Sequence, residues 1–456
     1  MHFTIRVEWR RQDGTTATEE LVTQNQDACK SAGDVGLPLA EAKRIVAWLQ
    51  GIVVNEQVEQ YCETARRCPT CGEYRPLKDN RQRRFYTVLG KLTVKAPRFE
   101  GCRACKDRPC VSPVSDLLRD RVSPELRYLQ AKFAAQLPYR QAADLLRELL
   151  PESGGLNHAT TTRNRTLAVG RSLDRELCRE IEHPQVPAEP AMEMVVGIDG
   201  AFVKAITSGI RQKQSLEILT GRVESTPRGG HAFAVVRNLE DGQAKQRVQA
   251  ILRRCGRGPD TKVRLLSDGE DGLRGVVGWF GKRCEHRLDW FHVSRRIDSI
   301  GKQLLYLRES PVYGWRLAFH SKNLHRIKWQ LWNHGVEMAD RGMKTFRAGL
   351  AEDAWDSPKL LERFQSVELK LDELRSYLYA NESAVRGYAK AFRQQKRVST
   401  AHVESTVNQL INWRMCKKQQ MRWSKAGAHC LLQVKTAAIN GQLQPFIATH
   451  PIAIAA

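Results

Sequence analysis

The spacing of apolar residues divides the chain into segments of different predicted structure. In the first 190 residues it predicts a strand over 3–9, a helix over 39–59, a hairpin over 84–94 that turns at Gly90, and helices over 126–137, 139–150 and from residue 157. Prolines are dense between residues 184 and 190, which is typical of a linker. We therefore expect small folded parts before residue 185 and a new domain after residue 190.

Beyond residue 190 the pattern predicts α/β structure followed by a long helical region. Strands are expected over 194–205, 216–223, 231–236, 262–267 and 286–288, and helices over 243–254 and 271–280. The spacing is helical from residue 291 to 396, and a last helical region over 400–443 ends in a short apolar tail. A sheet-based domain with many helices after its strands is the expected result.

The net charge of the chain limits the classes of partner that it is expected to bind. Its 456 residues are enough for about three domains, and an apolar fraction of 41% is ordinary for a folded protein. The 73 basic and 50 acidic residues leave a net charge of +23, which attracts polyanions. Nucleic acid is the expected partner, with an anionic membrane surface or the ribosome as weaker alternatives.

No apolar run approaches membrane-spanning length and the first residues lack a signal-peptide core, so we expect a cytoplasmic, nucleoid-associated protein.

Four of the 12 cysteines form two C-x2-C pairs, Cys68 with Cys71 and Cys102 with Cys105. Each pair turns two thiolates toward one ion, and two pairs make the four-sulfur set of structural zinc. The hairpin expected between them predicts a zinc ribbon over residues 61–115. Four buried thiols without metal are the alternative, and Cys110 could replace one ligand.

Basic residues near the ribbon and in the next helices suggest contacts with DNA. Around the ribbon these are Arg66, Arg67, Arg81, Arg83 and Arg84, which could bind phosphates or form a solvated basic face. The helices on either side of residues 151–156 permit a helix-turn-helix interpretation. In that case Arg163 and Arg165, near the start of the second helix, are candidate DNA contacts; an ordinary amphipathic hairpin is the alternative.

Three carboxylates are candidates for metal-dependent chemistry. Asp199 lies inside an apolar strand segment, and Asp268 ends another, just before Gly269. A charge in such a strand is costly to bury without a cation or partner, and two aspartates at one sheet edge can hold divalent cations for phosphoryl transfer. Either could instead cap a turn. Glu404, in the first turn of a predicted helix, is the candidate third ligand or a complement to the helix dipole.

The segment after Glu404 is basic. Residues 405–425 contain no acidic side chain, and tryptophans are interleaved with cations there. The candidate DNA-binding residues in this segment are Arg414, Lys417, Lys418 and Arg422. DNA lying across the end of the carboxylate site would suit this pattern.

Several strings occur in order and resemble one family. They are Val-Gly-Ile-Asp-Gly at 196–200, Ser-Asp-Gly-Glu-Asp-Gly at 267–272, Leu-Asp-Trp-Phe-His at 288–292 and the segment 403–423, with 68–72 and 123–134 upstream. Together they resemble the Kra group of bacterial insertion-sequence transposases, which are RNase H-like DDE transposases related to the Mutator-like branch. The resemblance covers roughly residues 60–440.

The resemblance implies a role for each candidate. Asp199, Asp268 and Glu404 would ligate two magnesium or manganese ions. Asp289 and His292 would support the site or position DNA; a satisfied histidine at a helix start is the alternative for His292. The implied multidomain α/β fold comprises an N-terminal α/β segment (1–60), the zinc ribbon (61–115), a helix-turn-helix-like helical DNA-binding region (116–185), an RNase H-like catalytic domain (191–292 and 398–445) and an all-helical insertion (293–397).

The activity expected from this resemblance is DNA transposition. The protein would bind the terminal inverted repeats of an insertion sequence, cleave DNA and join the freed end to target DNA. Its partners would be double-stranded DNA and further copies of itself, as a homodimer or larger assembly, because two element ends must meet in one complex. The alternatives are a non-catalytic zinc-ribbon DNA-binding regulator derived from a transposase, and an RNase H-like nuclease.

Overall fold

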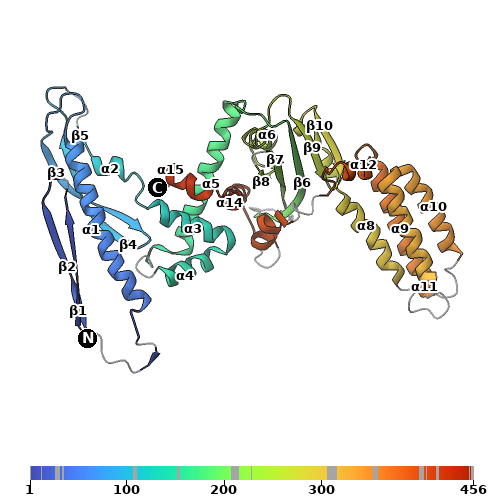
Figure 1. Ribbon diagram of the computed structural model, residues 1–456, viewed down its shortest axis with the longest axis horizontal. Coiled ribbons are helices and arrows are strands. Elements are labelled where there is room, and N and C mark those ends of the chain that lie inside the picture. Colours follow the sequence, from blue (N-terminus) through green and yellow to red (C-terminus); the bar gives the residue numbers. More distant parts are fainter. Residues whose placement is uncertain are drawn as a thin grey trace. The chain divides into compact units, whose positions relative to one another are not determined.

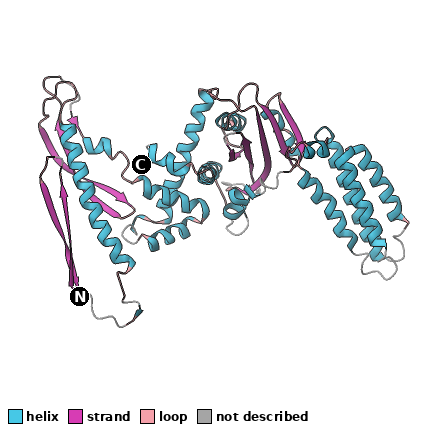
Figure 2. Ribbon diagram, in the orientation of Figure 1, coloured by secondary structure: helices cyan, strands magenta, loops and turns pink. Residues whose placement is uncertain are grey.

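The computed structural model describes most of the chain as two compact units. It describes residues 2–11, 13–25, 31–32, 35–105, 110–150, 155–206, 215–226, 229–305, 316–352, 358–399, 405–406, 408–416, 421–450 and 452. One unit comprises residues 1–172 and 437–456, and the other comprises 173–436. Figure 1 labels the elements and Figure 2 colours them by type. The five-part division expected from the sequence stays a prediction.

The first unit begins with strands and one long helix. Its elements are β1 (His2–Arg10), β2 (Thr16–Asn25), α1 (Leu39–Arg66), β3 (Leu77–Thr87), β4 (Gly90–Glu100), β5 (Cys110–Val111) and α2 (Pro113–Leu117). β1 and β2 pair with each other, and β3, β4 and β5 form a separate antiparallel sheet. The expected hairpin around Gly90 is confirmed, and α1 continues past its predicted end at residue 59.

A small core holds α1 against the β3–β4 hairpin. It contains Val58 and Cys62 from α1, Val94 and Ala96 from β4, and Val114 from α2. Removing these apolar side chains from water stabilises the unit, at roughly 25 cal/mol per Å² of apolar area buried. The small size of this core explains why a further restraint, such as a metal, would matter here.

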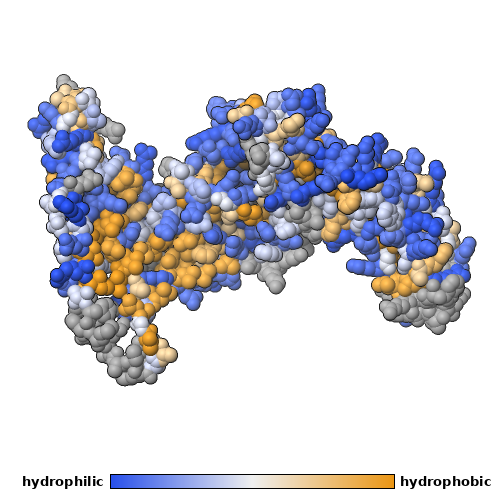
Figure 3. All heavy atoms as spheres, in the orientation of Figure 1, coloured by the Kyte–Doolittle hydropathy of each residue, from blue (hydrophilic) through white to orange (hydrophobic). Residues whose placement is uncertain are grey.

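Apolar residues also lie on the outer surface of α1. These are Leu39, Val46, Leu49 and Val53, whose exposed fractions range from 39% to 60%. Figure 3 shows a hydrophobic area over this helix. α1 therefore carries apolar side chains both toward the hairpin and on its surface.

Further helices belong to the first unit, together with a segment from the far end of the sequence. They are α3 (Pro124–Gln136), α4 (Tyr139–Leu149) and the first half of α5 (Ala159–Glu182), close to the predicted ranges; α5 continues past residue 172 as part of the second unit. Ser123 caps α3 by accepting a hydrogen bond of 3.2 Å from the backbone N–H of Leu126. The apolar tail expected after residue 443 is instead a helix, α15 (Leu443–Thr449), and it packs against α3.

The second unit is built on a mixed five-stranded sheet. Its strands are β6 (Glu193–Lys204), β7 (Ser215–Ser225), β8 (Gly229–Val236), β9 (Lys262–Ser267) and β10 (Cys284–Leu288). They lie in the order β10-β9-β6-β7-β8, with β7 antiparallel to its neighbours and β9 parallel to both β6 and β10. All five predicted strands are confirmed. The predicted helix over 271–280 is two short pieces, α7 (Asp271–Arg274) and a 3₁₀ turn (Val277–Phe280).

Helix α6 (Ala244–Arg254) covers the sheet, and a buried ion-pair network fixes it. Arg247 Nε and His429 Nε2 each lie 2.9 Å from Asp174 Oδ1. Burial raises the pKa of Asp174, but the hydrogen bonds from His429 and Arg247 outweigh it and hold this pKa well below its usual value. The network links three helices, because Asp174 lies in α5 and His429 in α14 (Lys425–Ile439).

The predicted long helical region is confirmed in its described parts. It consists of α8 (Trp290–Leu304), α9 (Arg316–His334), α10 (Val336–Ala351), α11 (Pro358–Ala380) and α12 (Tyr388–Arg393), which share one apolar core. We call these five helices the helical insertion. No helix in the described ranges has the length and apolar character required to cross a membrane.

The chain then returns to the sheet, and the last helical region expected over 400–443 is helical only in part of its described residues. Residues Asn408–Cys416 form a π-helix, and α14 starts only at Lys425. Between them the backbone of Trp423 pairs with the end of β6: its N–H donates to the Lys204 carbonyl at 3.0 Å and its carbonyl accepts from Ile206 at 2.8 Å. This pairing with an existing strand replaces helical hydrogen bonds at residue 423.

Candidate functional site

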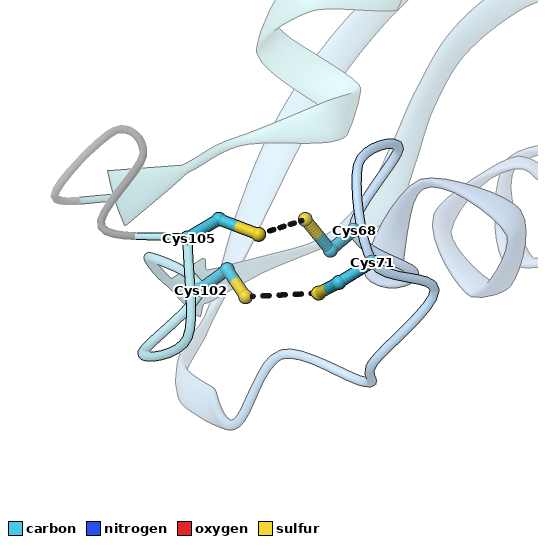
Figure 4. A group of neighbouring side chains, drawn as sticks. All are labelled: Cys68, Cys71, Cys102 and Cys105. Atoms are coloured by element: carbon cyan, nitrogen blue, oxygen red, sulfur yellow. Dashed lines mark hydrogen bonds between the residues drawn. The ribbon is translucent and has the colours of Figure 1, made fainter.

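Four cysteines converge in the first unit (Figure 4). The Sγ atoms of Cys68 and Cys105 are 3.9 Å apart, those of Cys71 and Cys102 are 3.4 Å apart, and all four lie within 4.8 Å of one another. Tetrahedral zinc with Zn–S bonds of about 2.3 Å requires S–S separations of roughly 3.8 Å. The cysteine cluster, meaning these four residues, therefore fits a structural zinc ion.

The backbone around Cys68 favours the thiolate form of this cysteine. Cys68 and Cys71 follow the end of α1, and the turn between them closes with a 2.9 Å bond from Gly72 N–H to the Cys68 carbonyl. Backbone N–H groups of Cys71 and Thr70 lower the pKa of the Cys68 thiol to about 6. The thiolate is the form that binds metal. Cys110 does not belong to this group, so the alternative in which it replaces one ligand is not supported.

The second unit brings Asp199 and Asp268 together at one edge of its sheet. In the parallel pairing of β6 with β9, Glu193 lies opposite Lys262 and Gly197 opposite Leu266. Continued by two residues, this register sets Asp199 beside Asp268, just beyond the carboxyl end of β9. The pairing of Leu288 with Ser267, continued by one residue, sets Asp289 beside Asp268 on the other side. We call these three aspartates the acidic edge.

Two carboxyls of the acidic edge have raised pKa values. Burial, followed by the charge of Asp268, raises the pKa of Asp199 to about 6. Burial also raises the pKa of Asp268, whose side chain accepts a 3.1 Å bond from the Glu270 backbone N–H. The charge of His292 acts in the opposite direction on both carboxyls. A bound divalent cation would relieve the repulsion between the two carboxylates, so this donor pair fits such an ion.

Asp289 and His292 lie close together, as the Asp-x-x-His string suggests. Asp289 is fully buried and caps α8, because its Oδ1 accepts a 2.8 Å bond from the Phe291 backbone N–H. Its Oδ2 lies 3.7 Å from Nε2 of His292. Asp289 thus orients the start of the helix that presents His292 to the acidic edge.

Two tyrosines of the helical insertion hold the strand ends that carry the acidic edge. The hydroxyl of Tyr377 donates to the Asp268 carbonyl at 2.6 Å, and that of Tyr388 donates to the Leu288 carbonyl at 2.9 Å. The guanidinium of Arg296 lies 4.1 Å from the Tyr377 ring centroid. Sequence reasoning missed these residues, since an isolated tyrosine in a helix has no spacing signal.

Gly269 allows the tight exit of the chain after Asp268. Its φ is +71°, a conformation that side chains rarely adopt, and a Cβ there would lie within 3 Å of the Leu288 and Asn381 side chains. We expect Gly269→Ala to lower the free energy of unfolding by about 2 kcal/mol or more. Calorimetry of the full chain measures this as a lower melting temperature for the second unit.

Gly275 is the matched control for that measurement. Its φ is −62° and nothing lies within 4 Å of a Cβ built there, so Gly275→Ala should leave the melting temperature nearly unchanged. Equal shifts in the two variants would contradict the proposed constraint at Gly269.

Three predicted site residues lie outside the described residues. They are Glu404, Lys417 and Lys418. Within the described ranges, the four cysteines are the one group of three or more His, Cys, Asp or Glu side chains at metal-ligand spacing. The role of Glu404 as a third ligand therefore stays a prediction.

The predicted DNA-binding arginines divide into exposed and buried residues. Arg163 and Arg422 are exposed. Arg165 is buried and donates a 3.1 Å bond to Gln130 of α3, while Arg414 is fully buried and its guanidinium lies 5.1 Å from the ring centroid of Trp423. Burial removes Arg165 and Arg414 from the surface that DNA could reach, so we no longer assign them to DNA binding.

No protein-family model matches the chain, and no curated protein matches it. Among solved structures, the Drosophila P element transposase strand transfer complex shows a likeness with a TM-score of 0.31 and 11% identity over 70% of this chain and 92% of that chain. A likeness of this size carries no argument about fold or function.

Proposed function

We propose that the protein is a DNA transposase of the Kra group whose second unit holds an RNase H-like catalytic domain. The main observation in support is the strand register that sets Asp199 beside Asp268 at one edge of a mixed sheet. The negative charge of Asp268 repels that of Asp199. The order of the matching strings along the chain supports the same proposal.

Asp199, Asp268 and Glu404 would hold two magnesium or manganese ions. When bound, such ions activate a hydroxyl nucleophile and stabilise the leaving oxygen of a phosphodiester. The chain's own groups position this chemistry. Asp289 caps α8 so that His292 faces the carboxylates, and Tyr377 fixes the backbone carbonyl of Asp268.

DNA binding is the second part of the proposal. The net charge of +23 favours a polyanion, and Arg163 and Arg422 are exposed and available to it. The zinc ion of the ribbon would stabilise a basic hairpin and would take no part in catalysis. Handling both element ends and a target requires a homodimer or larger assembly.

A joining assay tests this proposal directly. Purified protein is incubated with a labelled element end and a supercoiled plasmid, with magnesium or with EDTA. We expect labelled joint product only with the divalent ion, because the carboxylates need it to approach DNA.

The rival functions predict other products in the same reaction. A regulator derived from a transposase would shift the labelled end on a gel but join nothing. A nuclease of the RNase H kind would cut a nucleic acid strand in magnesium without joining it to the plasmid. Either result would replace the proposed function.

A further inference from the structure

A basic cavity of about 380 Å³ lies in the first unit, beside the β3–β4 hairpin. Residues of β3, β4 and α2 line it, together with the chain that follows α2. Its five arginines are Arg81, Arg83, Arg84, Arg98 and Arg121. We call it the arginine cavity.

Few carboxylates balance these arginines. Arg98 binds Asp79 through two guanidinium nitrogens, with Nε at 2.7 Å from Oδ1, and Arg81 lies 3.7 Å from the same carboxylate. Among the described residues, Asp79 is the carboxylate that forms ion pairs with arginines of the cavity. Arg84 and Arg121 are exposed and have no carboxylate partner among those residues.

Arg83 is fixed in place at the cavity wall. Its Nε and Nη2 donate to the Leu118 carbonyl at 3.1 and 2.6 Å, and its Nη1 donates to Ser115 Oγ at 3.1 Å. Burial and the nearby charge of Arg121 lower the pKa of Arg83. The arginines of the cavity therefore repel one another, and a bound anion would reduce this repulsion.

We infer that the arginine cavity binds phosphates of the DNA backbone. Guanidinium groups match phosphate oxygens in planar, bidentate hydrogen bonds. Arg83, Arg84 and Arg121, for which the described residues show no ion pair, place several positive charges together, as the successive phosphates of a DNA backbone require. A phosphate contact is independent of base sequence and would fix the position of the hairpin on the duplex. This inference deepens the proposed function by naming the surface of the first unit that holds DNA.

Salt-dependent binding to a duplex of arbitrary sequence tests the inference. Fluorescence anisotropy of a labelled duplex is followed with the full-length, zinc-loaded protein as the salt concentration is raised. Removing one arginine that binds a phosphate should reduce the slope of log K against log salt by about 0.9. For Arg84→Ala combined with Arg121→Ala we expect the slope to fall by about two units, with affinity at low salt reduced about tenfold or more.

A second double variant controls for net charge. Arg6→Ala combined with Arg44→Ala removes two arginines that are exposed in the same unit and do not line the cavity. It should change the slope much less. Zinc content and circular dichroism of both variants must match the wild type, which excludes misfolding as the cause.

Three outcomes would overturn the inference. The first is an unchanged slope in the cavity variant, and the second is an equal change in the control variant. The third is that the cavity variant no longer binds inorganic phosphate but still binds the duplex as the wild type does. That result would identify the cavity as a site for a free anion. Anisotropy measures binding and does not require joining. If the joining assay fails but the cavity variant still shows the smaller salt slope, the proposed function is rejected and this inference is kept.

Discussion

Asp199→Asn should lower the rate of strand joining by on the order of a thousandfold or more while leaving binding of the element end intact. Asparagine keeps the size of the side chain but removes the charge that would hold a divalent ion. Removing a negative charge also lessens repulsion of DNA, so the dissociation constant for the end should be equal or lower. Gel quantification of joint product and anisotropy measure the two effects separately.

The control for this variant is another acidic residue of the same unit. Asp271 is three residues from Asp268, but its side chain is 89% exposed and pairs with Arg274. Asp271→Asn should therefore join DNA at nearly the wild-type rate. Asp268→Asn and Glu404→Gln should behave like Asp199→Asn, and substantial joining by any one of these three would remove that residue from the catalytic set.

Cys71→Ser is expected to abolish zinc binding and unfold the base of the β3–β4 hairpin. Apparent binding free energies of structural zinc are about 10 to 16 kcal/mol near neutral pH, more than the small core under this hairpin can replace. Metal analysis should fall from about one zinc per chain to none. Hydrogen exchange of the β3 and β4 amides should become fast.

Cys110→Ser distinguishes the ligand set from the other thiols. Cys110 lies in β5, outside the cysteine cluster, so this variant should keep its zinc and its hairpin protection. Zinc retained by Cys71→Ser, or absent from Cys110→Ser, would mean that the ligand assignment is wrong.

Local patterns predicted most of the elements and the cysteine cluster. The five strands of the sheet were predictable because apolar residues recur along each one, and β9 has the predicted bounds. Cys68 and Cys71 are close in sequence, so their convergence follows from a single turn. Both the strands and the Cys68–Cys71 turn are determined by residues that are close together in the sequence.

Contacts between distant segments were not predictable in the same way. Tyr377 reaches the carbonyl of Asp268 across 109 residues of sequence, and no pattern near either residue indicates that contact. The prediction that Arg165 binds DNA rests on its charge and on its place near the start of the second helix of a possible helix-turn-helix. Helical spacing places Arg165 on the same face as Thr162, but the burial of this polar face is seen only in the structure.

The packing of α15 against α3 has a consequence for synthesis on the ribosome. Helix α3 ends at Gln136, and α15 begins at Leu443, about 300 residues later. At about 5 to 20 residues per second, roughly 15 to 60 s pass before α15 emerges. During that time the face of α3 that α15 covers is exposed to solvent or chaperones. The second unit, complete before α15 is made, can begin folding while the first still waits for its last helix.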